Sequence, residues 1–231
     1  MSIQTTKGAM QKLSVLLMFF VFLFYGCDNS TEVQNSGLSV TFFSGGSLQK
    51  VQNNTLQLNV VKALIRNLKF KSASSNDSSD IKLGPFVLHL NPDGINNEVM
   101  ISNIPPGSYD RIRFEIHKVE DSETPPDPEF KDGESGSERY SVIIKGSFNG
   151  NPFIYKSRRS TYQDIELQTP ITIEDNMSVN LTIMVNPYSW FFDEVDYLDP
   201  SDPSNESEIE MSIEHSFKDA FRDNNKDGTP D

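Results

Sequence analysis

The chain has 231 residues, with 20 Lys and Arg against 33 Asp and Glu, so its formal net charge at pH 7 is −13. Such an acidic chain lacks the basic surface that phosphate backbones need, and nucleic acid is therefore not an expected partner. Its single Cys excludes a disulfide framework within the chain and a cysteine-based zinc site.

The first 26 residues have the pattern of an export signal. Lys7 and Lys12 precede an apolar run, LSVLLMFFVFLFY, over residues 13–25. As a helix this run would rise only about 20 Å, which is short of the roughly 30 Å hydrocarbon core of a bilayer. The pattern therefore predicts a signal peptide over residues 1–26 rather than a membrane span.

The end of this run, Gly26-Cys27, resembles the bacterial lipobox in the looser form found in Bacteroidota. The resemblance implies cleavage before Cys27, lipidation of its sulfur and a place in the cell envelope, at the outer membrane. Two or three acyl chains would anchor the protein stably, because each buried CH₂ contributes about 0.8 kcal/mol. On this interpretation residues 27–36 are a polar tether and the membrane is a partner. An ordinary secretory signal with a chance Cys is the alternative.

Residues 37–192 predict an antiparallel β-sandwich of immunoglobulin or transthyretin type, with nine or ten short strands. Apolar and polar residues alternate, as they do in strands with one buried face. The predicted segments are 38–42, 56–70, 86–90, 99–104, 111–117, 140–144, 153–155, 165–167, 171–173 and 179–185. Residues 56–70 are long enough for two strands or one bent one. Because no helical pattern lies between the segments, parallel βαβ units are not expected, and a partly open barrel is the alternative closure.

Two acidic segments and one helix complete the predicted elements. Residues 120–138 hold eight acidic residues and three prolines, a composition that predicts a disordered loop. Residues 193–207 are predicted to be an acidic linker. Residues 208–222 predict an amphipathic helix, because Ile209, Ile213, Phe217, Ala220 and Phe221 share one face.

The acidic tail, residues 223–231, spaces oxygen-bearing side chains as a calcium loop does. Asp223, Asn225, Asp227 and Asp231 match positions 1, 3, 5 and 9 of such a loop, and Gly228 matches the sharp turn at position 6. The tail also resembles one unit of the repeats found in thrombospondin type 3 modules. The bidentate Glu of position 12 is not supplied, so the pattern predicts weak Ca²⁺ binding at most, and a solvated acidic tail is the alternative.

Aromatic residues gather near the end of the predicted sandwich. Tyr188, Trp190 and Phe191 could form a platform for a ligand, and packing of the same side chains in the core is the alternative. The three histidines, His89, His117 and His215, form no metal-binding pair of the HxH or HExxH kind. No nucleophile motif of the GxSxG or SxxK kind occurs either, so no catalytic residue is predicted.

The segment ISNIPPGSYDRIRFEIHKVE resembles the turn and strand of DUF4382-type lipoprotein domains, through Pro106, Gly107, Tyr109, Ile112, Arg113 and Phe114. That resemblance implies a β-sandwich and assigns no activity. Together the sequence features predict a non-enzymatic binding or structural module of the cell envelope, with a glycan or an envelope protein as its partner. An envelope hydrolase that uses paired carboxylates is the alternative function.

Overall fold

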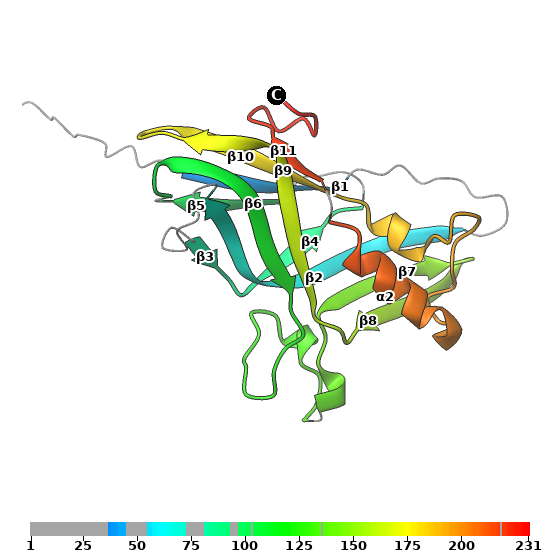
Figure 1. Ribbon diagram of the computed structural model, residues 1–231. Coiled ribbons are helices and arrows are strands. Elements are labelled where there is room, and N and C mark those ends of the chain that lie inside the picture. The colour runs from blue at the N-terminus through cyan, green and yellow to red at the C-terminus, as the bar shows by residue number, and fades with distance from the viewer. Residues whose placement is uncertain are drawn as a thin grey trace, which may run out of the picture. The chain divides into compact units, whose positions relative to one another are not determined.

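The computed structural model describes residues 37–44, 55–72, 81–92, 97–102, 104–134, 136–217 and 219–231. The chain divides into two units, and all the described residues lie in the second, Asn35–Asp231. They form two β-sheets with one α-helix beside them, as the sequence predicts (Figure 1). The predicted signal peptide, the lipidation site Cys27 and the tether lie outside the described residues and stay predictions.

The smaller sheet contains four of the described strands, in the order β11-β10-β1-β5. These strands are β1 (Gly37–Ser44), β5 (Asn97–Ser102), β10 (Ser178–Val185) and β11 (Asp219–Arg222). Strand β1 pairs with β5 in antiparallel fashion but with β10 in parallel, so that Leu38 lies opposite Val179. The sheet therefore departs at one pair from the fully antiparallel arrangement that the sequence predicts.

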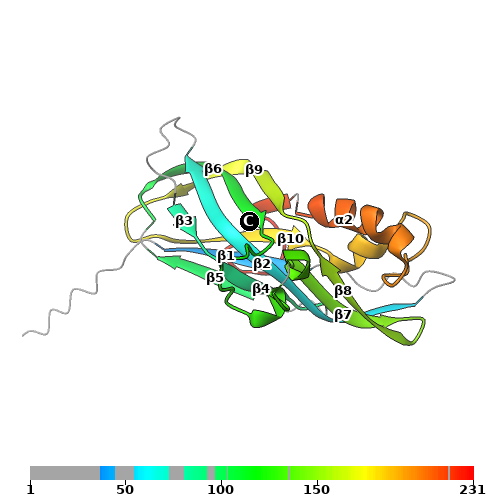
Figure 2. The same cartoon turned by 90° about the horizontal axis from the view of Figure 1, so that it is seen from below.

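The larger sheet contains seven of the described strands and is built around one long strand, β2 (Leu56–Ser72). The others are β3 (Ile81–Leu83), β4 (Phe86–Leu90), β6 (Gly107–Ile116), β7 (Val142–Phe148), β8 (Asn151–Ser157) and β9 (Thr161–Ile173). The first half of β2 pairs with β7 and the second half with β6, so the two halves of the sheet continue as β7-β8 and as β6-β9 (Figure 2).

The core lies between the two sheets. Phe42 of β1 meets Phe114 of β6 edge to face, with ring centroids 6.0 Å apart, and Phe217 also packs edge to face with Phe114, at 5.4 Å. All three rings are buried. Alternation places these apolar side chains inward and leaves the outer face of the larger sheet polar along β6 and β9.

Strand β2 changes which side chains face the core. Leu56 and Leu58 point into the core, but register shifts follow at Leu58/Val60 and again between Arg66 and Lys69. Each irregularity displaces the alternation by one residue. The first shift places Leu64 on the outer face, where it joins a second, smaller apolar cluster, and the second shift returns Leu68 and Phe70 to the core.

The second cluster is covered by residues 117–141, which connect β6 to β7 and are called the insertion below. Phe130 is its buried anchor and packs with Leu64 and Ile143. Two short 3-10 turns, η3 (Pro128–Phe130) and η4 (Gly136–Glu138), shape the segment. The prediction of disorder here was wrong. Acidic composition does not reveal that a buried aromatic side chain and ion pairs with lysines hold the segment in place.

The C-terminal helix is shorter than predicted. Helix α2 spans Glu206–Glu214, after the 3-10 turns η5 (Pro187–Phe191) and η6 (Pro203–Asn205). Ala220 and Phe221 belong to strand β11, which pairs with the open edge of β10. The prediction of helix over residues 208–222 was wrong beyond Glu214, since pairing with β10 overrides the helical pattern. Within the described residues, no helix is both long and apolar enough to cross a membrane.

Candidate functional site

The predicted aromatic platform is part of the core. Trp190 and Phe191 are 0% exposed and Tyr188 is also buried. The rings of Trp190 and Phe217 have centroids 6.3 Å apart, and Phe191 packs against the ring of Tyr155. Because η5 turns back over the end of the sandwich, consecutive aromatic side chains all reach apolar neighbours. The platform interpretation of Tyr188, Trp190 and Phe191 was therefore wrong.

The tail begins at Asp223, whose carboxylate is buried. It accepts hydrogen bonds from the hydroxyl of Thr182 at 2.8 Å and from the backbone N–H groups of Asp227 and Gly228 at 3.1 and 3.0 Å. Asp223 thus fastens the tail to strand β10. These bonds close the loop with the protein's own donors.

The other predicted calcium ligands lie on the surface of the same loop. Asn225 donates to the carboxylate of Asp227 at 3.0 Å, and the Asp231 carboxylate accepts from the backbone N–H of Asn224 at 3.0 Å. In the described part of the chain, no group of three or more His, Cys, Asp or Glu is arranged to hold a metal ion. Calcium binding by Asp223, Asn225, Asp227 and Asp231 stays a prediction.

Of the three histidines, only His117 is buried. His89 is on the exposed side of β4, and His215 follows helix α2, where its Nδ1 lies 2.8 Å from the carbonyl oxygen of Met211. His117 is 1% exposed and lies just after β6. Its position was not singled out by any motif in the sequence.

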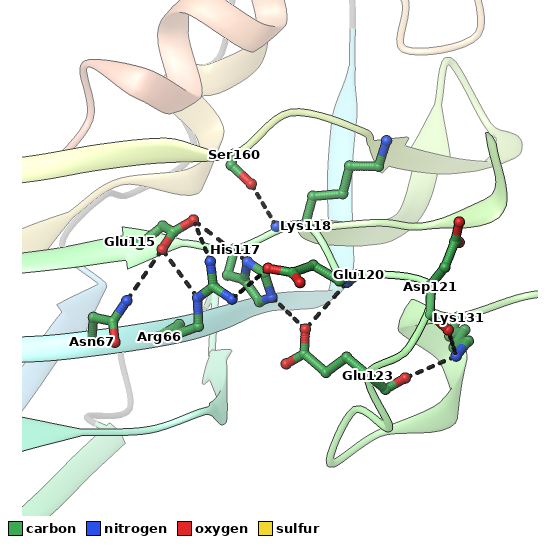
Figure 3. Close-up of polar contacts among 10 residues, drawn as sticks. All are labelled: Arg66, Asn67, Glu115, His117, Lys118, Glu120, Asp121, Glu123, Lys131 and Ser160. Atoms are coloured by element: carbon green, nitrogen blue, oxygen red, sulfur yellow. Dashed lines mark hydrogen bonds and ion pairs between the residues drawn. The ribbon is translucent and has the colours of Figure 1, made fainter. Parts of the chain in front are cut away.

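Figure 3 shows how His117 links β6, β2 and the insertion. Its Nε2 lies 2.6 Å from the carboxylate of Glu123, and its Nδ1 lies 3.5 Å from that of Glu115. Arg66 of β2 donates two hydrogen bonds to the carboxylate of Glu115, at 3.1 and 3.2 Å, and one to the carboxylate of Glu120, at 3.0 Å. A two-pronged arginine–carboxylate contact fixes both side chains in orientation.

The electrostatics of this cluster favour a fixed geometry. Burial alone would raise the pKa of Glu123, but the hydrogen bonds from His117 and from the backbone N–H of Glu120 lower it below its usual value. Lys131 adds bonds to the carbonyl oxygens of Asp121 and Glu123, at 2.6 and 2.8 Å. The first turn of the insertion is therefore held against the end of β6.

The insertion covers only one half of the outer face of the larger sheet. Over the β2-β7 half, Lys62 forms ion pairs with Asp127 and Glu129 at 2.7 Å each, and Lys145 also pairs with Glu129. Every one of these carboxylates comes from the insertion. Among the described residues, no segment covers the β2-β6-β9 half in this way, and its polar side chains face outward.

These outward side chains form the surface that we call the ladder face. It consists of Lys69 and Lys71 of β2, Arg111 and Arg113 of β6, and Tyr162, Asp164 and Glu166 of β9. The strand register sets Lys69 opposite Arg113, and Lys71 opposite Arg111. The same register sets Arg113 opposite Asp164, and Arg111 opposite Glu166. Like charges thus face each other between β2 and β6, and opposite charges between β6 and β9.

Asp164 holds the two arginines of the ladder face. Nη2 of Arg113 lies 2.8 Å from one carboxylate oxygen of Asp164, and Nε of Arg111 lies 3.6 Å from the other. Among the described residues, Lys69 forms no ion pair, and it lies beside this arginine pair. The ladder face therefore combines oriented guanidinium groups with the half-buried side chain of Lys69.

An open hollow of about 320 Å³ lies on the ladder face. Its polar lining includes Asn67, Lys69, Arg113, Glu115 and Asp164, and Tyr162 contributes an aromatic ring. Tyr162 is 76% exposed, in contrast to the buried aromatic rings of the core. Alternation in TYQDIELQ could have assigned Tyr162 to the polar face of its strand, but a single exposed aromatic carries no motif.

Comparisons with known proteins leave the chain without an assigned family. No family model matches it, so the likeness to DUF4382-type domains stays a resemblance, and no curated protein matches. A crystal structure from Bacteroides fragilis, of a protein provisionally named as a cell adhesion protein, aligns with 13% identity and a TM-score of 0.23. The alignment covers 66% of this chain and 41% of that one, so this chain corresponds to less than half of the solved protein.

Proposed function

We propose that this protein is a lipid-anchored, non-enzymatic module of the cell envelope that binds a glycan on its ladder face. The sequence of residues 1–27 supports the anchor, through its resemblance to a lipoprotein signal. The ladder face supports binding, because it lies on paired strands and no other described segment covers it. A site on strands positions its side chains more firmly than a site on loops does.

The exposure of Tyr162 is the observation that carries the proposal. An aromatic side chain is a large apolar surface, and folding tends to bury it. Here the ring stands in water beside the side chains of Asn67, Arg113 and Asp164. Binding sites combine an aromatic surface with a few polar groups that fix orientation. A sugar ring offers the matching chemistry, with an apolar face of C–H groups and a rim of hydroxyl groups.

The carboxylates in the hollow support binding rather than hydrolysis. Glu115 is held by Arg66 and Asn67, and Asp164 by Arg113. A hydrolase of the predicted alternative kind needs one carboxylic acid that delivers a proton and a second carboxylate across the scissile bond. Side chains already engaged by arginines suit the positioning of a ligand better than proton transfer.

A glycan array tests the proposal. The full chain, solubilised in detergent, is applied to neutral and acidic oligosaccharides beside three variants, Tyr162→Ala, Tyr162→Phe and Ile154→Ala. Ile154 is the matched control, because it is 62% exposed on the distant strand β8. We expect at least one glycan to bind, with affinity lower by about tenfold in Tyr162→Ala, the scale of one lost aromatic contact.

The control variants sharpen the result. Tyr162→Phe keeps the ring and should keep most of the affinity, and Ile154→Ala should bind like the wild type. Absence of glycan binding, or equal binding by Tyr162→Ala and the wild type, would overturn the proposal. Release of shortened sugars during incubation would instead assign the protein to the hydrolases.

A further inference from the structure

Resting on the proposed function, we infer that the glycan bound at the ladder face is acidic and that its carboxylate or sulfate groups bind Lys69 and the neighbouring arginines. The inference concerns the class of ligand. Its basis is the distribution of charge on the two halves of one sheet face.

The ladder face is locally basic on an acidic protein. It carries four basic residues, Lys69, Lys71, Arg111 and Arg113, and two acidic ones, Asp164 and Glu166, whereas the chain as a whole has a net charge of −13. A local surplus of positive charge attracts anions over short distances even where the net charge is negative.

The cross-strand pairs of like charge cost stability. Lys69 lies opposite Arg113, and Lys71 opposite Arg111, between β2 and β6. Like charges directly opposite each other in a sheet are destabilising, because their side chains extend from neighbouring backbone positions on the same face. The acidic residues of β9 lie beyond the arginines and adjoin only one side of each pair. An anion bound between β2 and β6 would relieve the repulsion.

On the covered half of the same sheet face, carboxylates of the insertion already pair with an outward lysine. There Lys62 of β2 points outward just as Lys69 does, and the insertion supplies the carboxylates of Asp127 and Glu129 at 2.7 Å. Those contacts act on the pKa of Lys62 as well: burial alone would lower it, but the two acids raise it above its usual value. On the open half we place the ligand's acidic groups where the insertion places its own.

The hollow places both recognition elements within reach of one ligand. Lys69, Arg113 and Tyr162 all line it. The ladder face covers three strands, with two outward positions on β2 and on β6 and three on β9, or about 10 Å across the strands and about 7–14 Å along them. This size suits a short stretch of sugar rings, one stacked on Tyr162 and an acidic group of the same or the next ring at Lys69. The acidic remainder of the surface disfavours duplex nucleic acid, which would extend far beyond the patch.

Calorimetry with a matched pair of ligands tests the inference. The full chain in detergent is titrated with oligogalacturonate, whose rings carry carboxylates, and with the same oligosaccharide fully methyl-esterified. A sulfated oligosaccharide forms a separate arm that distinguishes sulfate from carboxylate. The variants are Lys69→Gln and, as a control with the same change of net charge, Arg158→Gln in the segment between β8 and β9.

We expect an acidic oligosaccharide to bind about tenfold more tightly than its neutral counterpart, the scale of one charge-assisted hydrogen bond. Lys69→Gln should remove most of this difference and reduce the dependence of affinity on salt. Arg158→Gln should leave both unchanged.

Each contrary result has its own meaning. Equal binding of the acid and its ester, still dependent on Tyr162, would overturn the inference and leave the proposed function standing. Equal weakening by Lys69→Gln and Arg158→Gln would also overturn it, since net charge alone would then explain the effect. Displacement of the glycan by duplex DNA of equal charge would assign the face to nucleic acid. Absence of binding by any saccharide would overturn both proposals.

Discussion

Glu210 is a buried acid that joins helix α2 to the larger sheet. Its carboxylate accepts hydrogen bonds from the hydroxyl of Ser157 at 2.7 Å and of Tyr155 at 3.1 Å, both on β8. Burial raises the pKa of Glu210 above its usual value, and the two hydrogen bonds offset the rise only in part. Burial beside this carboxylate also raises the pKa of Tyr155.

The raised pKa predicts how stability depends on pH. The native state holds the proton of Glu210 more tightly than the unfolded chain does, so its contribution is fully present below the unfolded value, near 4.5, and is lost as pH rises through the native pKa. Glu210→Gln should flatten the pH dependence of the unfolding free energy over that range, measured by urea denaturation at several pH values. The exposed Glu208→Gln on the same helix is the control. Identical slopes in wild type and Glu210→Gln would contradict this account.

Tyr162 and Trp190 show when the exposure of a single residue can be predicted from the sequence. Strict alternation around Tyr162 indicates its outward direction, because a strand fixes the side of every second residue. Trp190 lies in a run of aromatic residues outside any strand, where no periodicity indicates burial. The burial of Trp190 depends on how η5 packs over the core. That packing is a tertiary contact, which the local sequence does not specify.

The insertion is an element whose order depends on one aromatic side chain. Phe130 is buried in the second apolar cluster with Leu64, Val119, Tyr140 and Ile143. Phe130→Ala should lower the free energy of unfolding by about 3–5 kcal/mol, the usual cost of removing a buried phenylalanine. Thermal and urea denaturation measure it.

A second readout separates local from global effects. Hydrogen exchange should rise within residues 117–141 of Phe130→Ala more than in β10, because the insertion loses its anchor. Lys131→Gln, which removes only bonds to the carbonyl oxygens of Asp121 and Glu123, should cost much less. A Phe130→Ala variant as stable as the wild type would show that the ion pairs alone hold the insertion.

At the scale of elements, alternation predicted the strands well and the helix only in part. The sequences of β6 and β10 alternate apolar and polar residues clearly, although β10 is buried on both faces over most of its length. The segment after Glu214 keeps a helical spacing of apolar residues, yet Ala220 and Phe221 pair with β10. Pairing with a distant strand edge depends on the whole fold, and periodicity within the segment cannot reveal it. The parallel pairing of β1 with β10 was hidden for the same reason.

The anchor concerns the molecule as a whole. Cys27→Ala removes the sulfur that the lipid would join, so the protein should move from the membrane fraction to the soluble fraction on cell fractionation. The substitution leaves every described residue unchanged, and the unfolding midpoint should not shift. A Cys27→Ala protein that stays bound to membranes as the wild type does would contradict lipid anchoring.

Charge at the same scale could be predicted from composition only as an average. The net charge of −13 correctly describes the chain but hides the basic ladder face. Lys69 and Lys71 lie far in the sequence from Arg111 and Arg113, and only the register between β2 and β6 brings the two pairs together. The candidate site is therefore a product of topology, which explains why no motif indicated it.

Hydroxyl-radical footprinting with a bound acidic oligosaccharide tests the central claim most directly, because it reports where the ligand lies. Tyr162 is 76% exposed and Met211, on helix α2 away from the ladder face, is 52% exposed, so both side chains are open to oxidation in the free protein. At saturation we predict that the oxidation rate of Tyr162 falls several-fold, because a stacked sugar ring would shield the aromatic side chain. The oxidation rate of Met211 should not change. Protection of Met211 with Tyr162 still fully reactive would contradict the assignment of the ladder face as the binding site.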